Sequence, residues 1–264
     1  MQGGGSTHRY HDQHQHQHHQ EAFRDCVEDL DRRRLRRHPR VVGEDDPLAV
    51  DFTSNDYLGL STHPLVRRAI AEAALEYGTW RSSPVVGGYS VHHRALEEAL
   101  IKLKRTEECM LFSSGFAANM GVMTTLARLG YSFLSDELNH ASLIDGMRCG
   151  RSRGGGRVGN DENHVAVYRH NDLGHLEELL RLESSSVARV AVVTDRLFSM
   201  DGDFCDLKGL LRLQKRYGFL LVVDEAHSTL VCVDEDIDDI EGGLVWPNPD
   251  VIRVGTLSKA VRYE

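Results

Sequence analysis

The stretch FLLVVDEAH, residues 219–227, is a short apolar run that ends in two carboxylates and a histidine. Comparable apolar runs occur along the chain, at CMLFSS 109–114, YSFLSD 131–136, VAVYRH 165–170, RVAVVTD 189–195 and VIRVGTLSK 251–259. From residue 50 onward these runs alternate with helical patterns. This alternation predicts an α/β domain with a mostly parallel sheet and flanking helices.

Helical periodicity is clearest in two segments. One face of the first carries Val66, Ala69, Ile70, Ala73 and Tyr77, and the second repeats the spacing over residues 95–103. In open parallel sheets, ligands bind outside the carboxyl ends of the strands. The polar residues that close the apolar runs are therefore the first candidates for chemistry.

Composition limits the classes of function. The chain has 264 residues, 41% of them hydrophobic, and a formal net charge of −9. The net negative charge argues against bulk nucleic-acid binding. No apolar run approaches the length of a membrane span, and the N-terminus resembles no secretory signal. The five cysteines are widely spaced without a C-x-x-C pair, which predicts reduced thiols in an intracellular protein.

Three regions follow from the composition. Residues 1–20, rich in His and Gln, are expected to form a disordered tail rather than a closed metal site. Residues 21–50 hold an acidic-then-basic segment with near-helical apolar spacing that ends at Pro39, which predicts a solvated amphipathic helix rather than an RNA or nuclear-import patch. Residues 51–264 are expected to form the large domain.

Candidate chemistry gathers at three strand ends. Asp224 closes a buried run and needs a cationic or protonated partner. Lys259 follows 35 residues later in GTLSKA, so one crossover and one strand would bring the two side by side. Ser114-Gly115-Phe116 opens a helical run, and a helix N-terminus suits a phosphate. A phosphate cradle, a carboxylate for a pyridinium nitrogen and a lysine for a Schiff base together describe a pyridoxal 5′-phosphate site.

Six motifs in order extend this hypothesis: NDYLGL 55–60, LFSSGFAANM 111–120, SDELNHASLIDG 135–146, FSMDGD 198–203, DEAHS 224–228 and GTLSKA 255–260. Over roughly residues 30–260 the chain resembles the α-oxoamine synthases of the pyridoxal-phosphate-dependent fold-type-I superfamily, whose large domain is that of the aspartate aminotransferase-like transferases. The resemblance implies this fold and cofactor.

The resemblance also implies roles for individual residues. Lys259 would hold the cofactor covalently, Asp224 would keep its ring nitrogen protonated, and His140 would stack on the ring and help to position the substrate. The other implied contacts are His227 to the ring hydroxyl, Gly115, Phe116, Ser199 and Thr256 to the ring and phosphate, and Asn55 and either Arg34 or Arg36 to the substrate.

By the same resemblance the reaction would be a decarboxylative condensation of L-alanine with pimeloyl-CoA or a pimeloyl-carrier, giving the biotin precursor 8-amino-7-oxononanoate. Glycine C-acetyltransferase and 5-aminolevulinate synthase share most of the motifs and stay as alternatives, as does a non-catalytic fragment. The resemblance further implies a homodimer without nucleic-acid or membrane partners, in the cytoplasm, with the peroxisome as an alternative compartment.

Two departures from the family pattern stand out. The glycine-rich run expected before the second helix reads GTWRSSPVVGGYS, with bulky Trp80 and Arg81 inside it. After Lys259 the chain reads AVRYE and stops, where the family continues with A-x-G-x-x-G-G and a further strand. The expectation is a large domain truncated before its last sheet strand and before the C-terminal domain.

Overall fold

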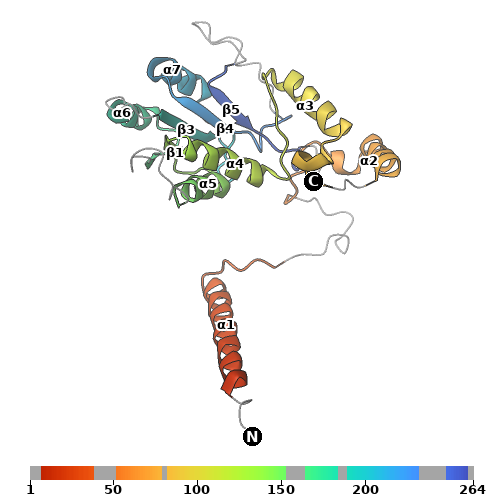
Figure 1. The fold of residues 1–264 in the computed structure, drawn as a ribbon. Coiled ribbons are helices and arrows are strands. Elements are labelled where there is room, and N and C mark those ends of the chain that lie inside the picture. The colour runs from red at the N-terminus through yellow and green to blue at the C-terminus, as the bar shows by residue number, and fades with distance from the viewer. Residues whose placement is uncertain are drawn as a thin grey trace. The chain divides into compact units, whose positions relative to one another are not determined.

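The computed structural model of the chain describes residues 7–38, 52–78, 82–152, 164–183, 189–231 and 248–260. The chain divides into two compact units, residues 1–52 and 53–264. The described residues of the first unit form helix α1 (Thr7–Arg32) and a short segment after it, and the second unit contains a sheet with its covering helices (Figure 1).

A five-stranded parallel sheet forms the centre of the second unit. The strands are β1 (Tyr131–Asp136), β2 (Val165–Tyr168), β3 (Arg189–Asp195), β4 (Leu220–Asp224) and β5 (Val251–Val254). Their order in the sheet is β2-β1-β3-β4-β5, and every neighbouring pair is parallel. The predicted α/β fold with a parallel sheet is confirmed.

Helices cover both faces of the sheet. Helices α4 (Gly115–Arg128) and α5 (Ala141–Ser152) lie on one face, and α6 (Leu173–Glu183) and α7 (Leu207–Tyr217) lie on the other (Figure 1). The remaining helices are the 3-10 turn Leu60–Thr62, α2 (Pro64–Tyr77), a short π-helical turn at Pro84–Gly88 and α3 (Val91–Lys104). Both periodic segments predicted to be helical are helices.

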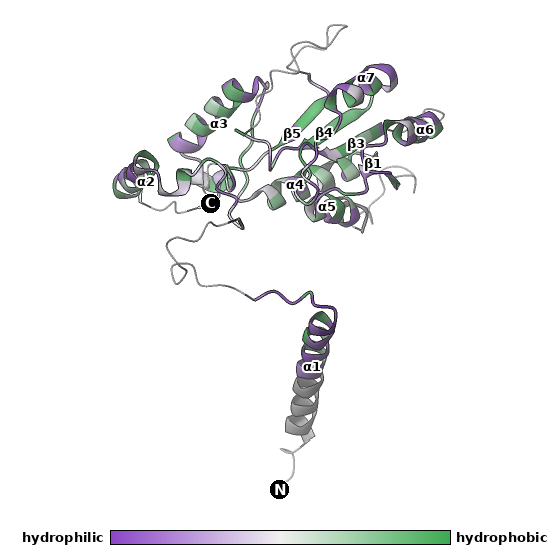
Figure 2. Cartoon of the chain, turned by 180° about the vertical axis from the view of Figure 1, so that it is seen from behind, coloured by the Kyte–Doolittle hydropathy of each residue, from purple (hydrophilic) through white to green (hydrophobic). Residues whose placement is uncertain are grey.

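Two apolar cores result because successive residues of a strand point to opposite faces. Leu134, Val192 and Leu221 pack in the core under α6 and α7, and their chain neighbours Phe133 and Val193 pack in the core under α4 and α5. Full burial of such a side chain stabilises the fold by about 1.5–3 kcal/mol. Figure 2 shows the result as green strands between helices that turn purple faces outward.

The strand register places the polar strand ends along one edge of the sheet. Asp195 of β3 lies opposite Asp224 of β4, and Asp224 lies opposite Val254 of β5. Lys259 follows β5 by five residues. The expectation that Asp224 and Lys259 sit beyond neighbouring strand ends is therefore correct.

Two segments differ from the sequence-based expectations. Residues 109–114 form no strand, because among the described residues no neighbouring chain pairs with them. The N-terminal helix begins at Thr7, inside the segment expected to be disordered, and ends at Arg32, before Pro39. Helix extension past an existing turn is cheap, and glutamine is a good helix former. Arg34, just past the helix, has a positive φ of 55°.

Candidate active site

A pocket of about 230 Å³ lies beyond the carboxyl ends of β3, β4 and β5 and against the N-terminus of α4. Seven of the residues predicted from the sequence line it: Gly115, Phe116, His140, Asp224, His227, Thr256 and Lys259. Segments up to 144 residues apart in the chain thus converge on one site.

Asp224 is a buried carboxylate with both oxygens engaged. Its Oδ1 accepts a hydrogen bond from the backbone N–H of Ala226 at 2.8 Å. Its Oδ2 accepts one from Nδ2 of Asn119 at 2.6 Å. A buried carboxylate without such donors would cost several kcal/mol. The two donors hold Asp224 in place at the pocket wall.

Lys259 is the cation of the pocket and is only half-buried. Burial lowers the pKa of its ammonium group, and the nearby charges of Asp224 and Asp195 oppose this effect without cancelling it. The amine is thus neutralised more easily than that of a solvated lysine. A neutral amine is the form that attacks a carbonyl or takes up a proton.

Two histidines face the same pocket from different elements. His140 precedes α5, and its Nδ1 lies 2.7 Å from Oγ of Ser142. His227 follows β4, and burial together with the Lys259 charge lowers its pKa. Its Nδ1 lies 2.7 Å from the hydroxyl of Tyr57, which donates to Oδ1 of Asn55 at 3.1 Å. The predicted residue Asn55 therefore reaches the site through Tyr57.

The N-terminus of α4 closes the pocket on its remaining side. Ser114 caps the helix by accepting a hydrogen bond from the backbone N–H of Ala117 at 3.1 Å. A Cβ at Gly115 would lie 3.3 Å from Cβ of Thr256, so only glycine lets the two segments approach without adjustment. The positive end of the helix dipole favours an anion here.

The structure places the remaining predicted residues elsewhere. Ser199 is exposed in a turn after β3 and does not line the pocket. Arg34 and Arg36 belong to the first compact unit, where Arg36 pairs with Asp31 at 2.8 Å. Their roles toward substrate stay predictions. Residues 79–81 of the altered glycine-rich run, which include Trp80 and Arg81, fall outside the described residues.

Sequence reasoning missed several residues of the site. Asn119, Ser142 and Asp195 line the pocket, and Tyr57 contacts His227. Burial and the Asp224 charge raise the pKa of Asp195 to about 8. Asp195 carries the same signal as Asp224, a carboxylate at the end of an apolar strand, and could have been found by it. Asn119 follows Gly115 by one helical turn, which is a weaker signal.

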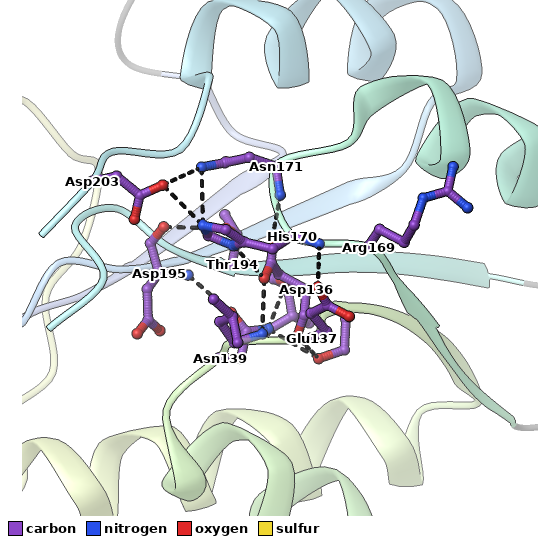
Figure 3. Close-up of polar contacts among 12 residues, drawn as sticks. Asp136, Glu137, Asn139, Arg169, His170, Asn171, Thr194, Asp195 and Asp203 are labelled. Atoms are coloured by element: carbon purple, nitrogen blue, oxygen red, sulfur yellow. Dashed lines mark hydrogen bonds and ion pairs between the residues drawn. The ribbon is translucent and has the colours of Figure 1, made fainter. Parts of the chain in front are cut away.

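A second polar cluster ties the turn that carries Ser199 to the sheet (Figure 3). We call it the His170 cluster, and it consists of Asp136, His170, Asn171 and Asp203. Nδ1 of His170 lies 2.9 Å from Asp136, and Nε2 lies 2.8 Å from Asp203. Nδ2 of Asn171 also donates to Asp203, at 2.9 Å. The cluster joins the ends of β1 and β2 to residues 198–203.

Other kinds of site find no support in the part of the chain that the structure describes. Its residues contain no group of three or more His, Cys, Asp or Glu side chains arranged to hold a metal ion. In the same residues, no helix combines the length and the apolar character that crossing a bilayer requires.

Residues 49–262 match the family model described as aminotransferase class I and II. The chain belongs to the aminotransferase class I and II family.

Two curated relatives in this family are 8-amino-7-oxononanoate synthases. The Arabidopsis thaliana protein is 43% identical over 224 residues, which cover 79% of this chain and 45% of the relative. The Geobacter sulfurreducens protein is 41% identical over 223 residues, covering 84% of this chain and 54% of the relative. The chain thus spans about half the length of the curated relatives it matches.

Solved structures agree on the fold of this aminotransferase-family chain. A serine palmitoyltransferase from S. paucimobilis, solved with bound PLP and myriocin, matches with a TM-score of 0.66 and 29% identity over 79% of this chain and 50% of that one. The 8-amino-7-oxononanoate synthase of Francisella tularensis matches with a TM-score of 0.52 and 26% identity, over 69% and 46%. The resemblance to α-oxoamine synthases and the fold-type-I architecture are confirmed.

Proposed function

We propose that the chain forms the cofactor-binding part of a pyridoxal 5′-phosphate-dependent acyltransferase that condenses L-alanine with a pimeloyl thioester. The products would be 8-amino-7-oxononanoate, CO₂ and the free thiol. The observation that carries the proposal is the convergence of Lys259, Asp224 and the N-terminus of α4 on one pocket. The names of the relatives at 43% and 41% identity support the choice of substrates.

The residues present fit this cofactor. The glycine at 115 leaves room where a Cβ would press on Thr256, beside the backbone N–H groups of the first turn of α4. A phosphate would lie there. Asp224, held by Asn119 and Ala226, would face the ring nitrogen, and His227 would face the ring hydroxyl. Lys259 would supply the covalent link.

The bound cofactor would supply an electron sink for the carbon that loses its proton. The chain's own residues would handle charge and position. Lys259, with its lowered pKa, would take the Cα proton of the amino acid at Nζ. The carboxylate of Asp224 would keep a proton on the ring nitrogen. His140 would lie over the ring and orient the substrate.

Lysine trapping tests the cofactor assignment. The full chain is incubated with pyridoxal phosphate, reduced with borohydride and mapped by peptide mass spectrometry. We expect the label on Lys259 and its loss in Lys259→Ala. Lys102→Ala, on the exposed side of α3, is the matched control and should keep the label. Label on another lysine, or none on a folded chain, would contradict the assignment.

Substrate competition separates the remaining alternatives. The loaded chain is offered L-alanine, glycine or L-serine, each with pimeloyl-CoA, acetyl-CoA, succinyl-CoA or palmitoyl-CoA, and products are identified by mass. We expect condensation of L-alanine with the pimeloyl group. Another productive pair would assign another α-oxoamine synthase reaction. Labelling of Lys259 without any product would favour the non-catalytic alternative. The homodimer and the cytoplasmic location stay predictions.

A further inference from the structure

Asn119 joins two walls of the pocket through one amide nitrogen. Its side chain is buried in α4. Nδ2 donates to Oδ2 of Asp224 at 2.6 Å and to Oγ of Ser142 at 2.9 Å. The amide cannot be turned around, because its oxygen would then face the carboxylate of Asp224. Both protons of Nδ2 are therefore used, one for each acceptor.

The direction of the next hydrogen bond follows from the backbone. The N–H of Ser142 points at Nδ1 of His140 at 3.2 Å. A backbone N–H can only donate, so Nδ1 of His140 accepts and carries no proton. The 2.7 Å contact between Oγ of Ser142 and Nδ1 is then a donation by the serine hydroxyl. The oxygen of that hydroxyl remains free to accept from Asn119.

We infer that Ser142 and Asn119 are positioning residues that hold His140 as the neutral tautomer with its proton on Nε2. The inference rests on the proposed function for its consequence. In this tautomer Nε2–H is the one ring donor left for a ligand, and a substrate carboxylate or carbonyl oxygen is the acceptor that would use it. The same chain of hydrogen bonds runs from His140 through Ser142 and Asn119 to Asp224. Asn119 would therefore help to hold both the histidine proposed to stack on the cofactor ring and the carboxylate proposed to face its nitrogen.

The surrounding charges do not replace this support. The charged or titratable groups that line the pocket around His140 are Asp195, Asp224, His227 and Lys259. Asp195 contacts the backbone of His140 and not its ring, because the backbone N–H of His140 donates to Oδ1 of Asp195 at 3.5 Å. Ser142 is fully buried, and its hydroxyl and backbone N–H are the two donors that reach Nδ1.

Nitrogen-15 NMR of the histidine rings tests the inference without reference to activity. The full chain is labelled, and the His140 signals are identified by their loss in His140→Gln. We expect the shift pattern of an Nε2–H tautomer in the wild type. Ser142→Ala removes the hydroxyl donor at 2.7 Å and leaves only the longer backbone N–H contact at 3.2 Å, so it should move the signals toward a mixture of tautomers. Ser142→Thr, which keeps the hydroxyl, should restore them, and Ser113→Ala, at an exposed serine, should leave them unchanged. An Nδ1–H pattern in the wild type, or no change in Ser142→Ala, would overturn the inference.

Steady-state kinetics give a second readout, measured on the active chain or on a relative that has the matching serine. Loss of one hydrogen bond to the positioning chain should reduce kcat/KM for the amino acid about tenfold in Ser142→Ala. Borohydride labelling of Lys259 should remain. This separates the two proposals, because failure of labelling in the wild type refutes the cofactor assignment while the tautomer measurement stands by itself.

Discussion

Individual residues carry the chemistry of the pocket, and their neighbours set their charge. Asp224 and Asp195 lie opposite each other at the ends of β4 and β3, yet only Asp224 has two strong donors. Two like charges so close in a buried site are not both tolerated. Asp195 accordingly has a pKa raised to about 8, by burial and by the charge of Asp224. Of the two carboxylates, Asp224 is the one equipped to stay ionised.

Asp224→Asn keeps the shape of the side chain and removes its charge. The ring nitrogen of a bound cofactor would then lose its proton, and the Cα proton of L-alanine would be held much more tightly. We expect pyridoxal phosphate to bind while exchange of that proton with D₂O, followed by NMR, slows by orders of magnitude. Asp145→Asn, at an exposed aspartate of α5, serves as the control and should exchange at the wild-type rate. Equal rates in both variants would refute the role of Asp224.

Asp195 predicts a fall in stability as pH rises. Its folded pKa of about 8 lies above its ordinary value of 3.8, so the folded chain binds the proton more tightly. The stabilisation that this bound proton gives the folded chain is complete below about pH 4 and is lost as pH rises to about 8. Between these limits the wild type should lose a few kcal/mol of unfolding free energy relative to Asp195→Asn, measured by denaturant titration. A difference that does not change with pH would show that Asp195 is ionised in the folded chain.

Secondary-structure elements bring these residues together through packing and through clusters at their ends. Helices α4 and α5 approach so closely that a Cβ at Gly150 would lie 2.4 Å from Cβ of Ala127. The same two helices are joined by the hydrogen bond from Nδ2 of Asn119 on α4 to Oγ of Ser142 on α5, at 2.9 Å. Beyond the carboxyl ends of β1 and β2, the His170 cluster holds the turn 198–203 through the contact of His170 with Asp203 (Figure 3).

The His170 cluster predicts a pH-dependent turn. Burial lowers the pKa of His170, but the hydrogen bonds to Asp136 and Asp203 outweigh it, and the net pKa is raised. The stabilisation is complete below the ordinary value of 6.5 and is lost as pH rises through the folded pKa. From pH 6 to 9 the wild type should therefore lose unfolding free energy that His170→Gln does not lose, measured by denaturant titration.

Limited proteolysis near the exposed Met200 reports on the turn directly. Cleavage of the wild type should accelerate over the same pH range, while Asp203→Asn should be cleaved readily throughout. A wild-type rate that stays flat across the range would mean that His170 does not hold the turn by its charge.

At the scale of the whole molecule, β5 forms one edge of the sheet in the described part of the second unit. Among the described residues, β5 pairs with β4 and with no strand on its other side. A cavity of about 1020 Å³ lies along this edge, between α3, residues 105–115 and β5. Unpaired strand edges beside apolar surface promote association between chains.

We therefore expect residues 1–264, expressed alone, to associate in a concentration-dependent way and to turn over weakly if at all. Sedimentation velocity and turnover with pimeloyl-CoA measure the two effects. A chimera that continues with the segment following the matching lysine of a relative is the comparison, and it should stay at one defined size. If residues 1–264 form a dimer of one defined size with the same turnover as the chimera, the edge at β5 causes neither association nor loss of turnover.

Much of the fold and of the site was readable from the sequence by itself. Apolar runs and helical periodicity are local properties, so strands β1 to β5 and helices α2 to α4 appear where the pattern predicts them. Lys259 and Asp224 were found because a charged residue at the end of an apolar run is costly and therefore informative.

What only the tertiary structure decided depends on contacts between distant segments. Residues 109–114 have the composition of a strand but form none, since a strand exists only with a partner. The bonds of Asn119 to Asp224 and of Tyr57 to His227 span 105 and 170 positions, and no local pattern encodes them. Helix packing and strand register determine which polar atoms meet. Those contacts raise the pKa of Asp195 beside Asp224, and they are the basis of the tautomer that we infer for His140.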